Sequence, residues 1–225
     1  MEKHFQIAID GPAAAGKSTV AKIVAKKLGF VYIDTGAMYR SLTYKALKTG
    51  APLNNGEGLK TLLDQTEIVL RQTADGQKVI VDGQDVSEQI RHPDVSAQVS
   101  LVSSFKEVRS EMVSRQRELA ACCSVVMDGR DIGTHVLPKA QVKIFLKASV
   151  EERAIRRYKE EEAQGRHPSI DYLKEAIALR DKKDSERLIS PLVKAADAVE
   201  LDTTSLSIDQ VVAKILTIAN EGYSL

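Results

Sequence analysis

Residues 11–18 read Gly-Pro-Ala-Ala-Ala-Gly-Lys-Ser, a spacing of residue types that suits the binding of nucleotide phosphates. Two glycines followed by a lysine and a hydroxyl residue match the phosphate-binding loop pattern. Glycines let the backbone fold tightly around phosphates, so that N–H groups and a helix N-terminus point at the negative charge. We expect Lys17 to reach the β and γ oxygens and Ser18 to ligate Mg²⁺. An ordinary strand–turn–helix loop is the alternative interpretation.

The elements around this segment favour phosphate binding over an ordinary loop. Residues 5–10 read as a buried strand, and residues 17–29 read as a helix with one apolar face. A match in this strand–loop–helix context is far more specific than the pattern alone. The sequence therefore predicts a site for a nucleoside triphosphate.

A second candidate group follows the strand predicted at residues 30–34. Thr35 is a candidate N-cap for the next helix. Tyr39 and Arg40 would be read as one face of an amphipathic helix if they stood alone. Here they lie at the C-terminal end of a predicted parallel strand, where open α/β sheets bind ligands.

A third group follows the apolar strand predicted at residues 124–128. An apolar strand that ends in an acid such as Asp128 is typical of a carboxylate that organises Mg²⁺. Arg130 and Asp131 follow at the same strand end. A single acid there often caps a turn, but two acids with an arginine around a glycine favour a functional role.

Residues 51–104 differ in character from the flanking sequence. Two short β-rich runs, at residues 67–72 and 78–81, are separated by a hairpin signal at residues 74–77. A helix is predicted from Pro93 to about residue 102. We interpret this segment as an insertion that forms a small mobile lobe, and an insertion without function is the alternative.

Two cationic helices follow the strand predicted at residues 142–146. Ser149 and Glu152 form a capping box for the first helix. A Gly/Pro turn at residues 165–168 separates it from a second helix at residues 169–187. The arginines at helical spacing favour a hinged lid over phosphates, whereas a solvated charged face is the simpler alternative. These arginines are Arg153, Arg157, Arg180 and Arg187.

These elements predict one α/β domain of the P-loop NTPase type, with a parallel sheet flanked by helices. The predicted core comprises residues 1–40, 105–152 and 188–225, the monophosphate-binding insert about 41–104, and the helical lid about 153–187. A length of 225 residues with 43% hydrophobic residues suits a single domain with a full core. Lys and Arg number 32 against 31 acids, a net charge of +1 that favours neither nucleic acid nor a membrane as partner.

We expect a cytoplasmic protein. The first strand begins within a few residues of the N-terminus, which leaves no room for a signal peptide, and no apolar run is long enough to span a bilayer. Cys122 and Cys123 are adjacent and cannot form an ordinary structural disulfide. The four histidines make no metal-ligand pattern. We expect a monomer, because no self-pairing surface is evident.

The supply of arginines after residue 100 indicates the type of reaction. A phosphate monoester acceptor is mostly dianionic at pH 7, because its second pKa is about 6. Transfer to such an acceptor needs no general base, but it needs positive charge to hold two anions in line. The sequence therefore favours a kinase that acts on a phosphorylated acceptor over a hydrolase.

Taken residue by residue, the chain resembles the bacterial cytidylate kinases, within the nucleoside monophosphate kinases. The likeness covers nearly the whole chain in the right order and includes the large insertion. The motifs that carry it are Ile9-Asp10-Gly11-Pro12 with Gly16-Lys17-Ser18-Thr19, Asp34-Thr35-Gly36-Ala37-Met38-Tyr39-Arg40, Asp128-Gly129-Arg130-Asp131-Ile132-Gly133-Thr134, residues 142–146 followed by 149–157, and Arg180-Asp181 with Asp184 and Arg187.

The resemblance implies transfer of the γ-phosphoryl group of ATP to CMP or dCMP, with Mg²⁺, and a role for each site residue. ATP would bind Gly11, Pro12, Ala13, Ala14, Ala15, Gly16, Lys17, Ser18 and Thr19, with Arg153 and Arg157 from the lid. The metal would bind Ser18 and Asp128. The acceptor phosphate would bind Thr35, Tyr39, Arg40, Arg130 and Arg187, the ribose Asp184 and Arg180, and the cytosine edge Ser100, Arg109 and Asp131. Lys17, Arg130, Arg157 and Arg187 would act on the transferred group.

Two rival hypotheses remain open. A kinase of the same fold could use another acceptor, such as UMP, AMP or a small metabolite like shikimate. The enlarged insert favours a nucleotide, and the motif at residues 128–131 favours cytosine. A nucleotide-dependent switch that binds a protein partner is the rival of another class. A GTPase switch usually has an Asn-Lys-x-Asp segment that reads guanine, and the sequence contains none.

Overall fold

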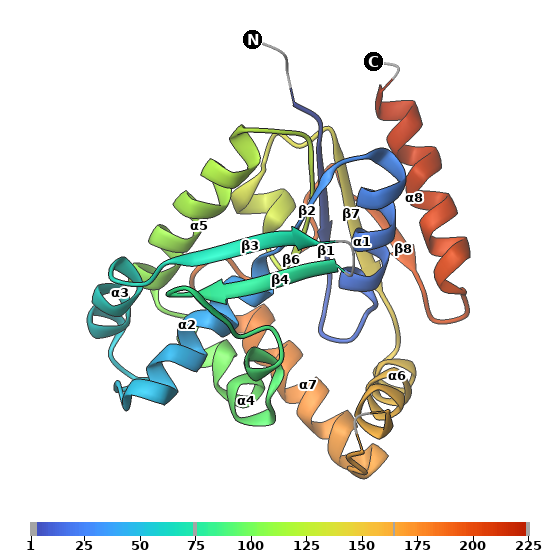
Figure 1. Cartoon of the computed structure of the whole chain (residues 1–225). Coiled ribbons are helices and arrows are strands. Elements are labelled where there is room, and N and C mark those ends of the chain that lie inside the picture. Colours follow the sequence, from blue (N-terminus) through green and yellow to red (C-terminus); the bar gives the residue numbers. More distant parts are fainter. Residues whose placement is uncertain (1–3, 74–75, 164, 224–225) are drawn as a thin grey trace.

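A parallel five-stranded sheet forms the centre of the molecule (Figure 1). The computed structural model of the chain describes residues 4–73, 76–163 and 165–223. The sheet has the order β2-β6-β1-β7-β8, and every neighbouring pair in it is parallel. Its strands are β1 (Gln6–Asp10), β2 (Val31–Asp34), β6 (Val125–Gly129), β7 (Val142–Lys147) and β8 (Val199–Asp202).

Helices cover both faces of this sheet, as its apolar strands require. Helices α1 (Lys17–Leu28) and α8 (Ile208–Tyr223) pack on one face, where Val20, Val24 and Ile215 meet the strands. The other face is covered by α5 (Lys106–Ala121) and by η2 (Ile132–Val136), a single π-helical turn (Figure 1). This arrangement confirms the predicted α/β class with a parallel sheet.

The insertion forms a second, smaller unit beside the sheet. It contains the later part of α2 (Thr35–Thr49), a helix that begins in the predicted core. The elements that follow are α3 (Gly56–Asp64), β3 (Ile68–Thr73), β4 (Gly76–Val81), β5 (Gln84–Asp85), η1 (Gln89–Arg91) and α4 (Pro93–Val102). The predicted hairpin is present as antiparallel β3 and β4, although Ala74 and Asp75 of its turn signal lie outside the described residues.

Helix α3 was not predicted from the sequence. The Asn-Asn-Gly run at residues 54–56 indicates a turn, and the structure has a turn at residues 53–54, after which Asn55 caps α3 by accepting the N–H of Gly58 at 3.1 Å. The fully buried Leu59 and Leu63 hold this helix against α2 and α5.

The hairpin of the insertion is attached to the edge of the central sheet. The side-chain amides of Gln72 and Gln77 both donate to the backbone carbonyl of Tyr32 in β2, at 2.7 and 2.6 Å. Because β2 is an edge strand, its outer carbonyl groups have no strand partner among the described residues, and these glutamines satisfy one of them. The hydrogen bonds connect the insertion directly to a strand that ends at the site.

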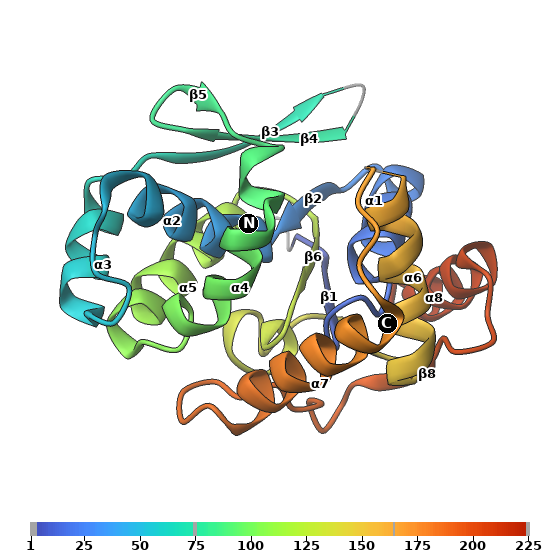
Figure 2. The ribbon, with the colours of Figure 1, turned by 90° about the horizontal axis from the view of Figure 1, so that it is seen from below.

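Helices α6 (Val150–Glu162) and α7 (Ile170–Glu186) form the helical pair predicted as a lid. The predicted capping box is confirmed at the start of α6, where the Ser149 hydroxyl accepts the N–H of Glu152 at 3.1 Å. Ala154, Leu173 and Ile177 form the small apolar contact between the two helices. Helix α7 begins beside α6 and ends near α4, so that it crosses below the strand ends (Figure 2). Within the described residues, no helix has the length and apolar character needed to cross a membrane.

Candidate active site

The phosphate-binding loop connects the end of β1 to the start of α1, as predicted. Gly11 has a φ of 147°, and a Cβ there would lie 2.3 Å from the carbonyl oxygen of Leu146 in β7, which excludes every other residue type. Gly16 and Ala14 also have positive φ, of 87° and 57°. Alternation of left- and right-handed residues turns successive N–H groups inward, the arrangement that binds anions.

Lys17 lies at the first position of α1 and is buried. Its Nζ folds back and donates to the carbonyl oxygen of Pro12 at 2.6 Å. Burial, followed by the charge of Arg130, holds the pKa of Lys17 well below its usual value. An ammonium group placed next to another cation in a water-poor site binds phosphate oxygens more strongly than it would in water.

Asp128 and Ser18 provide oxygen ligands beside this loop. The Ser18 hydroxyl donates to Asp128 Oδ2 at 2.9 Å, and the Tyr32 hydroxyl donates to Asp128 Oδ1 at 2.7 Å. Burial, followed by the charge of Asp34, raises the pKa of Asp128. A cation at this carboxylate would therefore relieve an unfavourable buried charge.

This pair fits Mg²⁺ bound together with a nucleotide. Among the described residues, no group of three or more His, Cys, Asp or Glu side chains could hold a metal unaided. Mg²⁺ at kinase sites is usually held by one or two protein oxygens, with phosphates and waters completing its shell. One hydroxyl and one carboxylate at hydrogen-bonding distance match that requirement.

Helix α2 brings the second predicted group to the same edge of the sheet. The Thr35 hydroxyl donates to the carbonyl oxygen of Asp128 at 2.7 Å. The prediction that Thr35 is the N-cap was wrong, because Asp34 caps α2 by accepting the N–H of Ala37 at 2.7 Å. Asp34 also pairs with Arg40 at 3.0 Å, which holds this guanidinium beside the strand end.

Asp131 lies between two arginines, one from α5 and one that directly follows α7. Arg109 of α5 makes a very short buried contact with Asp131 Oδ2, and Nη2 of Arg187 lies 3.5 Å from Oδ1. Arg109 also lies over the ring of the buried Tyr39, 5.4 Å from its centroid. Four predicted acceptor residues from α2, α5, the loop after β6 and the end of α7 therefore form one cluster.

Asp184 of α7 contacts two more of the predicted acceptor residues. Arg130 Nε donates to Asp184 Oδ2 at 2.8 Å, and the Ser100 hydroxyl donates to Oδ1 at 3.3 Å. Burial alone would raise the pKa of Asp184, but Arg130 and then Arg180 hold this pKa below its usual value. The structure thus brings Ser100 to Asp184, while Arg109 contacts Asp131.

Arg180 is a buried cation near Asp184 that forms no close ion pair with it. Among the described residues it makes no ion pair, and its Nε is buried without a hydrogen bond. Burial, followed by the charge of Arg130, lowers the pKa of Arg180 to about 10. Surplus positive charge of this kind is stabilised by a bound polyanion.

Comparison with known proteins decides between the rival acceptor classes. The family model for cytidylate kinase matches residues 7–221. The chain belongs to the cytidylate kinase family. A cytidylate kinase of Bacillus cytotoxicus is 60% identical over 222 residues, covering 99% of each chain. One of Bacillus subtilis strain 168 is 61% identical over 216 residues, covering 96% of each chain.

The cytidylate kinase family identifies the chain as a nucleoside monophosphate kinase. A solved structure, an uncharacterised protein from Eubacterium ventriosum, has a TM-score of 0.53 with 15% identity and covers 97% of this chain and 99% of its own. At that identity, the likeness supports the fold alone.

The arginines of α6 take different positions in this cytidylate kinase family member. Arg153 is buried, donates to the carbonyl oxygen of Ala13 at 3.1 Å and pairs with Asp181 at 2.6 Å, so it joins α6 and α7 to the phosphate loop. Arg157 pairs with two glutamates of its own helix, Glu160 and Glu161, at 3.3 and 2.6 Å.

Arg156 and Tyr32 were not predicted as site residues. Nη1 of Arg156 lies 3.8 Å from the position of a Cβ on Gly16, closer to the phosphate loop than the sequence suggested. Arg156 Nη2 also donates to the carbonyl oxygen of Thr203 at 2.6 Å. The spacing of Arg156 from Arg153 is a helical repeat that could have indicated this position. No sequence signal relates Tyr32 to Asp128, because 96 residues separate them.

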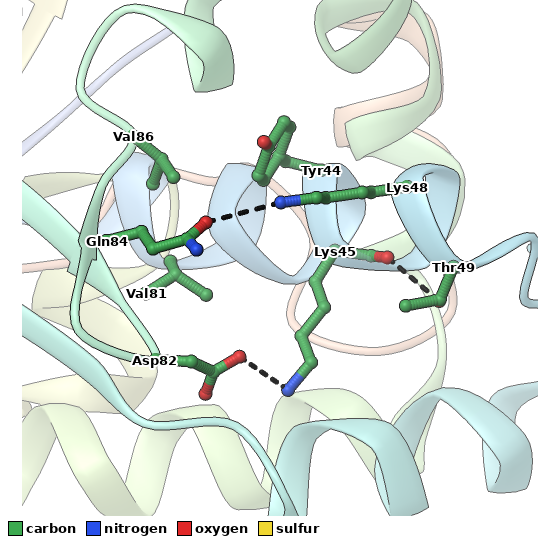
Figure 3. Close-up of a pocket in the computed structure, with 8 residues that line it drawn as sticks. All are labelled: Tyr44, Lys45, Lys48, Thr49, Val81, Asp82, Gln84 and Val86. Atoms are coloured by element: carbon green, nitrogen blue, oxygen red, sulfur yellow. Dashed lines mark hydrogen bonds and ion pairs between the residues drawn. The ribbon is translucent and has the colours of Figure 1, made fainter.

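A pocket of about 220 Å³ lies away from these strand ends, between α2 and the β4–β5 turn (Figure 3). Its charged groups are paired within the protein, with Lys45 at 2.8 Å from Asp82 and Lys48 donating to Gln84 at 3.3 Å. Figure 3 shows both contacts crossing the pocket rather than pointing at a common centre. We assign the pocket no role in the reaction of the cytidylate kinase family.

Proposed function

We propose that the chain transfers the γ-phosphoryl group of ATP to CMP or dCMP, giving ADP and CDP or dCDP. The observation that supports this most directly is the convergence of Lys17, Arg130 and Arg180 at the strand ends. The charges of both arginines lower the pKa of Lys17, so the three cations lie within electrostatic reach of one another. Three such cations suit a transition state in which several phosphate oxygens carry negative charge.

In this proposal, the phosphate loop binds ATP and the acceptor network binds CMP. Residues 11–19 hold the ATP phosphates. Thr35, Arg40 and Arg130 hold the acceptor phosphate, together with Tyr39 and Arg187. Mg²⁺, held by Ser18 and Asp128, would neutralise charge on the phosphate oxygens. We further infer a cytoplasmic monomer.

The reaction needs positioning rather than a general base. The acceptor phosphate is already mostly dianionic at neutral pH. Arg130 and Arg187 would hold it in line with the γ-phosphoryl group, and Lys17 would stabilise the charge that develops on the transferred oxygens. Closure of α6 and α7 over the two nucleotides would exclude water, which would otherwise compete as acceptor.

Discrimination for cytosine would come from Asp131, Arg109 and Ser100. Cytosine presents an amino donor at position 4 and acceptors at N3 and O2, which an acid or hydroxyl and an arginine complement. Uracil reverses the first two groups and would leave buried polar groups unpaired. Each unpaired group costs about 1–3 kcal/mol, which corresponds to about tenfold or more in selectivity.

The decisive experiment is ADP formation from Mg·ATP with purified protein, run in parallel with CMP, dCMP, UMP, AMP and no acceptor. Strong turnover with CMP and dCMP, and little with UMP or AMP, is the expected result. Turnover mainly with UMP or AMP would keep the kinase and overturn the cytosine assignment. ADP formation independent of any acceptor would refute the kinase. Thermal stabilisation by CMP in the absence of ATP provides a second check, because a ligand that binds the native state raises its unfolding temperature.

A further inference from the structure

Asp10 is a buried acid between the phosphate loop and the segment that carries Arg130 and Asp131, and it has no role in the proposed chemistry. It is the last residue of β1 and directly precedes Gly11, where the phosphate loop begins. Its side chain is 5% exposed. The carboxylate accepts the backbone N–H of Ile132 at 2.8 Å and that of Gly133 at 2.7 Å. One side chain therefore joins segments that are more than 120 residues apart.

The two N–H groups belong to the first residues of η2, immediately after Asp131. The first N–H groups of a helical turn have no partner within the turn and need an external acceptor. On the other side, the carbonyl oxygen of Asp131 accepts the N–H groups of His135 and Val136, at 2.9 and 3.2 Å. The backbone that carries Asp131 is thus held through η2, and Asp10 is the anchor of η2 to β1.

The carboxylate is present despite a cost to folding. Burial raises the pKa of Asp10 to about 6, against the effect of the Gly133 and Ile132 hydrogen bonds, and the nearby charge of Asp131 raises it further. Lys17 of α1 is the cation that opposes this shift. Lys143 of β7 also packs against Gly133, but it pairs with Asp197. A neutral side chain would avoid the burial cost but could not accept two N–H groups equally well.

We propose that Asp10 is a positioning residue that sets the place of Arg130 and Asp131 relative to the phosphate loop. It would act through backbone hydrogen bonds to η2 and contact neither nucleotide. The inference rests on the proposed function, because it assumes that Arg130 and Asp131 bind the acceptor. It implies that a defect at Asp10 appears in acceptor binding, although Asp10 is next to the ATP-binding loop in sequence.

The test is the variant Asp10→Asn, assayed with CMP and ATP varied in turn. The amide keeps the size of the side chain but replaces one acceptor with a donor that faces a backbone N–H. We expect kcat/KM for CMP to fall about tenfold at pH 8, the effect of one lost buried hydrogen bond. We expect the KM for ATP to stay close to wild type. Equal effects on both substrates, or none on CMP, would overturn the proposal.

A pH series separates positioning from a general structural role. As pH falls through about 6, Asp10 of the wild type gains a proton and loses one acceptor, so the wild type should come to resemble the variant. The wild-type advantage in kcat/KM for CMP should therefore shrink from about tenfold at pH 8 to near unity at pH 5. The phosphate of CMP titrates in the same range, but it does so equally for both proteins and cancels in the ratio. A ratio that is constant with pH would contradict the proposal.

Two further variants complete the test. Asp85→Asn controls for the chemical change itself, because Asp85 also accepts a backbone N–H, from Ser87 at 3.1 Å, but is exposed and pairs with Lys78 rather than with a predicted site residue. It should leave both KM values unchanged. Asp10→Ser keeps one acceptor in a smaller side chain and should show an intermediate, CMP-selective loss even if Asp10→Asn does not fold. A wild type that is inactive with CMP would refute the proposed function itself, whereas an active wild type with insensitive Asp10 variants would refute only this inference.

Discussion

The two halves of the site are built in opposite ways. The phosphate loop is a single run of consecutive residues whose binding groups are mainly backbone N–H groups, positioned by Gly11 and Gly16. The acceptor half is made of side chains from α2, α4, α5, the loop after β6 and α7, and acids hold its arginines in place. Local backbone conformation determines the first half, and tertiary packing assembles the second.

This difference shows how the fold keeps positive charge at the site before substrate binds. In the acceptor half, Asp34 pairs with Arg40, Asp131 with Arg109 and Asp184 with Arg130. A buried arginine without an acid would be costly, so these pairs let the fold carry the cations that phosphates need. Lys17 and Arg180 make no ion pair among the described residues, and burial lowers the pKa of each.

The largest effect is expected from Lys17→Ala. Loss of one preorganised charge at the transferred group should lower kcat by about a thousandfold. The unfolding temperature should not fall, because the fold already disfavours the charged form of Lys17. Lys143→Ala is the matched control, since Lys143 is also buried but pairs with Asp197 at 2.7 Å. It should lower stability and leave kcat close to wild type, as measured by steady-state kinetics and thermal unfolding. Near-normal activity of Lys17→Ala would refute the site.

Arg180→Met should show whether the charge of Arg180 serves substrate binding or the stability of the fold. Among the described residues Arg180 makes no ion pair, and burial with the charge of Arg130 outweighs the attraction of Asp184, so its removal should keep or raise the unfolding temperature. The same change should lower kcat/KM for CMP by about a hundredfold, within the range for one electrostatic contact to a transferring group. A variant that loses stability but keeps its activity would show that Arg180 stabilises the fold and does not bind substrate.

Asp131→Ala should change selectivity as well as stability. It leaves Arg109 buried without its acid, which should cost about 3–5 kcal/mol of folding free energy. We expect the loss of kcat/KM to be about tenfold greater with CMP than with UMP, because only cytosine has an amino group that could donate a hydrogen bond to this carboxylate. Equal losses with the two nucleotides, measured in parallel, would show that Asp131 does not read the base.

The smallest effect is expected from Tyr32→Phe, which tests the support that Tyr32 gives to Asp128, the predicted metal ligand. The variant removes the hydroxyl that donates to Asp128 Oδ1 at 2.7 Å and leaves the ring in place. The Mg²⁺ concentration for half-maximal rate should rise about tenfold, the low end for loss of an outer contact to a metal ligand. At saturating Mg²⁺ the rate should return to that of the wild type. A lower rate that excess Mg²⁺ does not restore would mean that Tyr32 acts elsewhere.

Local sequence signals predicted most of the fold. The apolar runs predicted β1, β2, β6 and β7 in order, and the Ser149 cap located the start of α6. Thr35 was wrongly predicted as the cap because two adjacent residues could cap α2. In the structure Asp34 is the cap, and the hydroxyl of Thr35 donates to the carbonyl oxygen of Asp128, which is distant in sequence. Helix α3 was missed because its polar, glycine-containing start hides the two buried leucines that hold it.

In the candidate site, too, local features could be predicted from the sequence and long-range pairings could not. The sequence by itself determined the phosphate loop, because glycine conformation and the order of strand, loop and helix are properties of neighbouring residues. It also supplied the cations and acids of the acceptor half, through their motifs. Only the tertiary structure decided which acid holds which arginine, that Arg153 joins the lid to Ala13, and that Asp10 anchors η2. Such pairings join residues far apart along the chain, and they form only when the packed sheet brings its strand ends together.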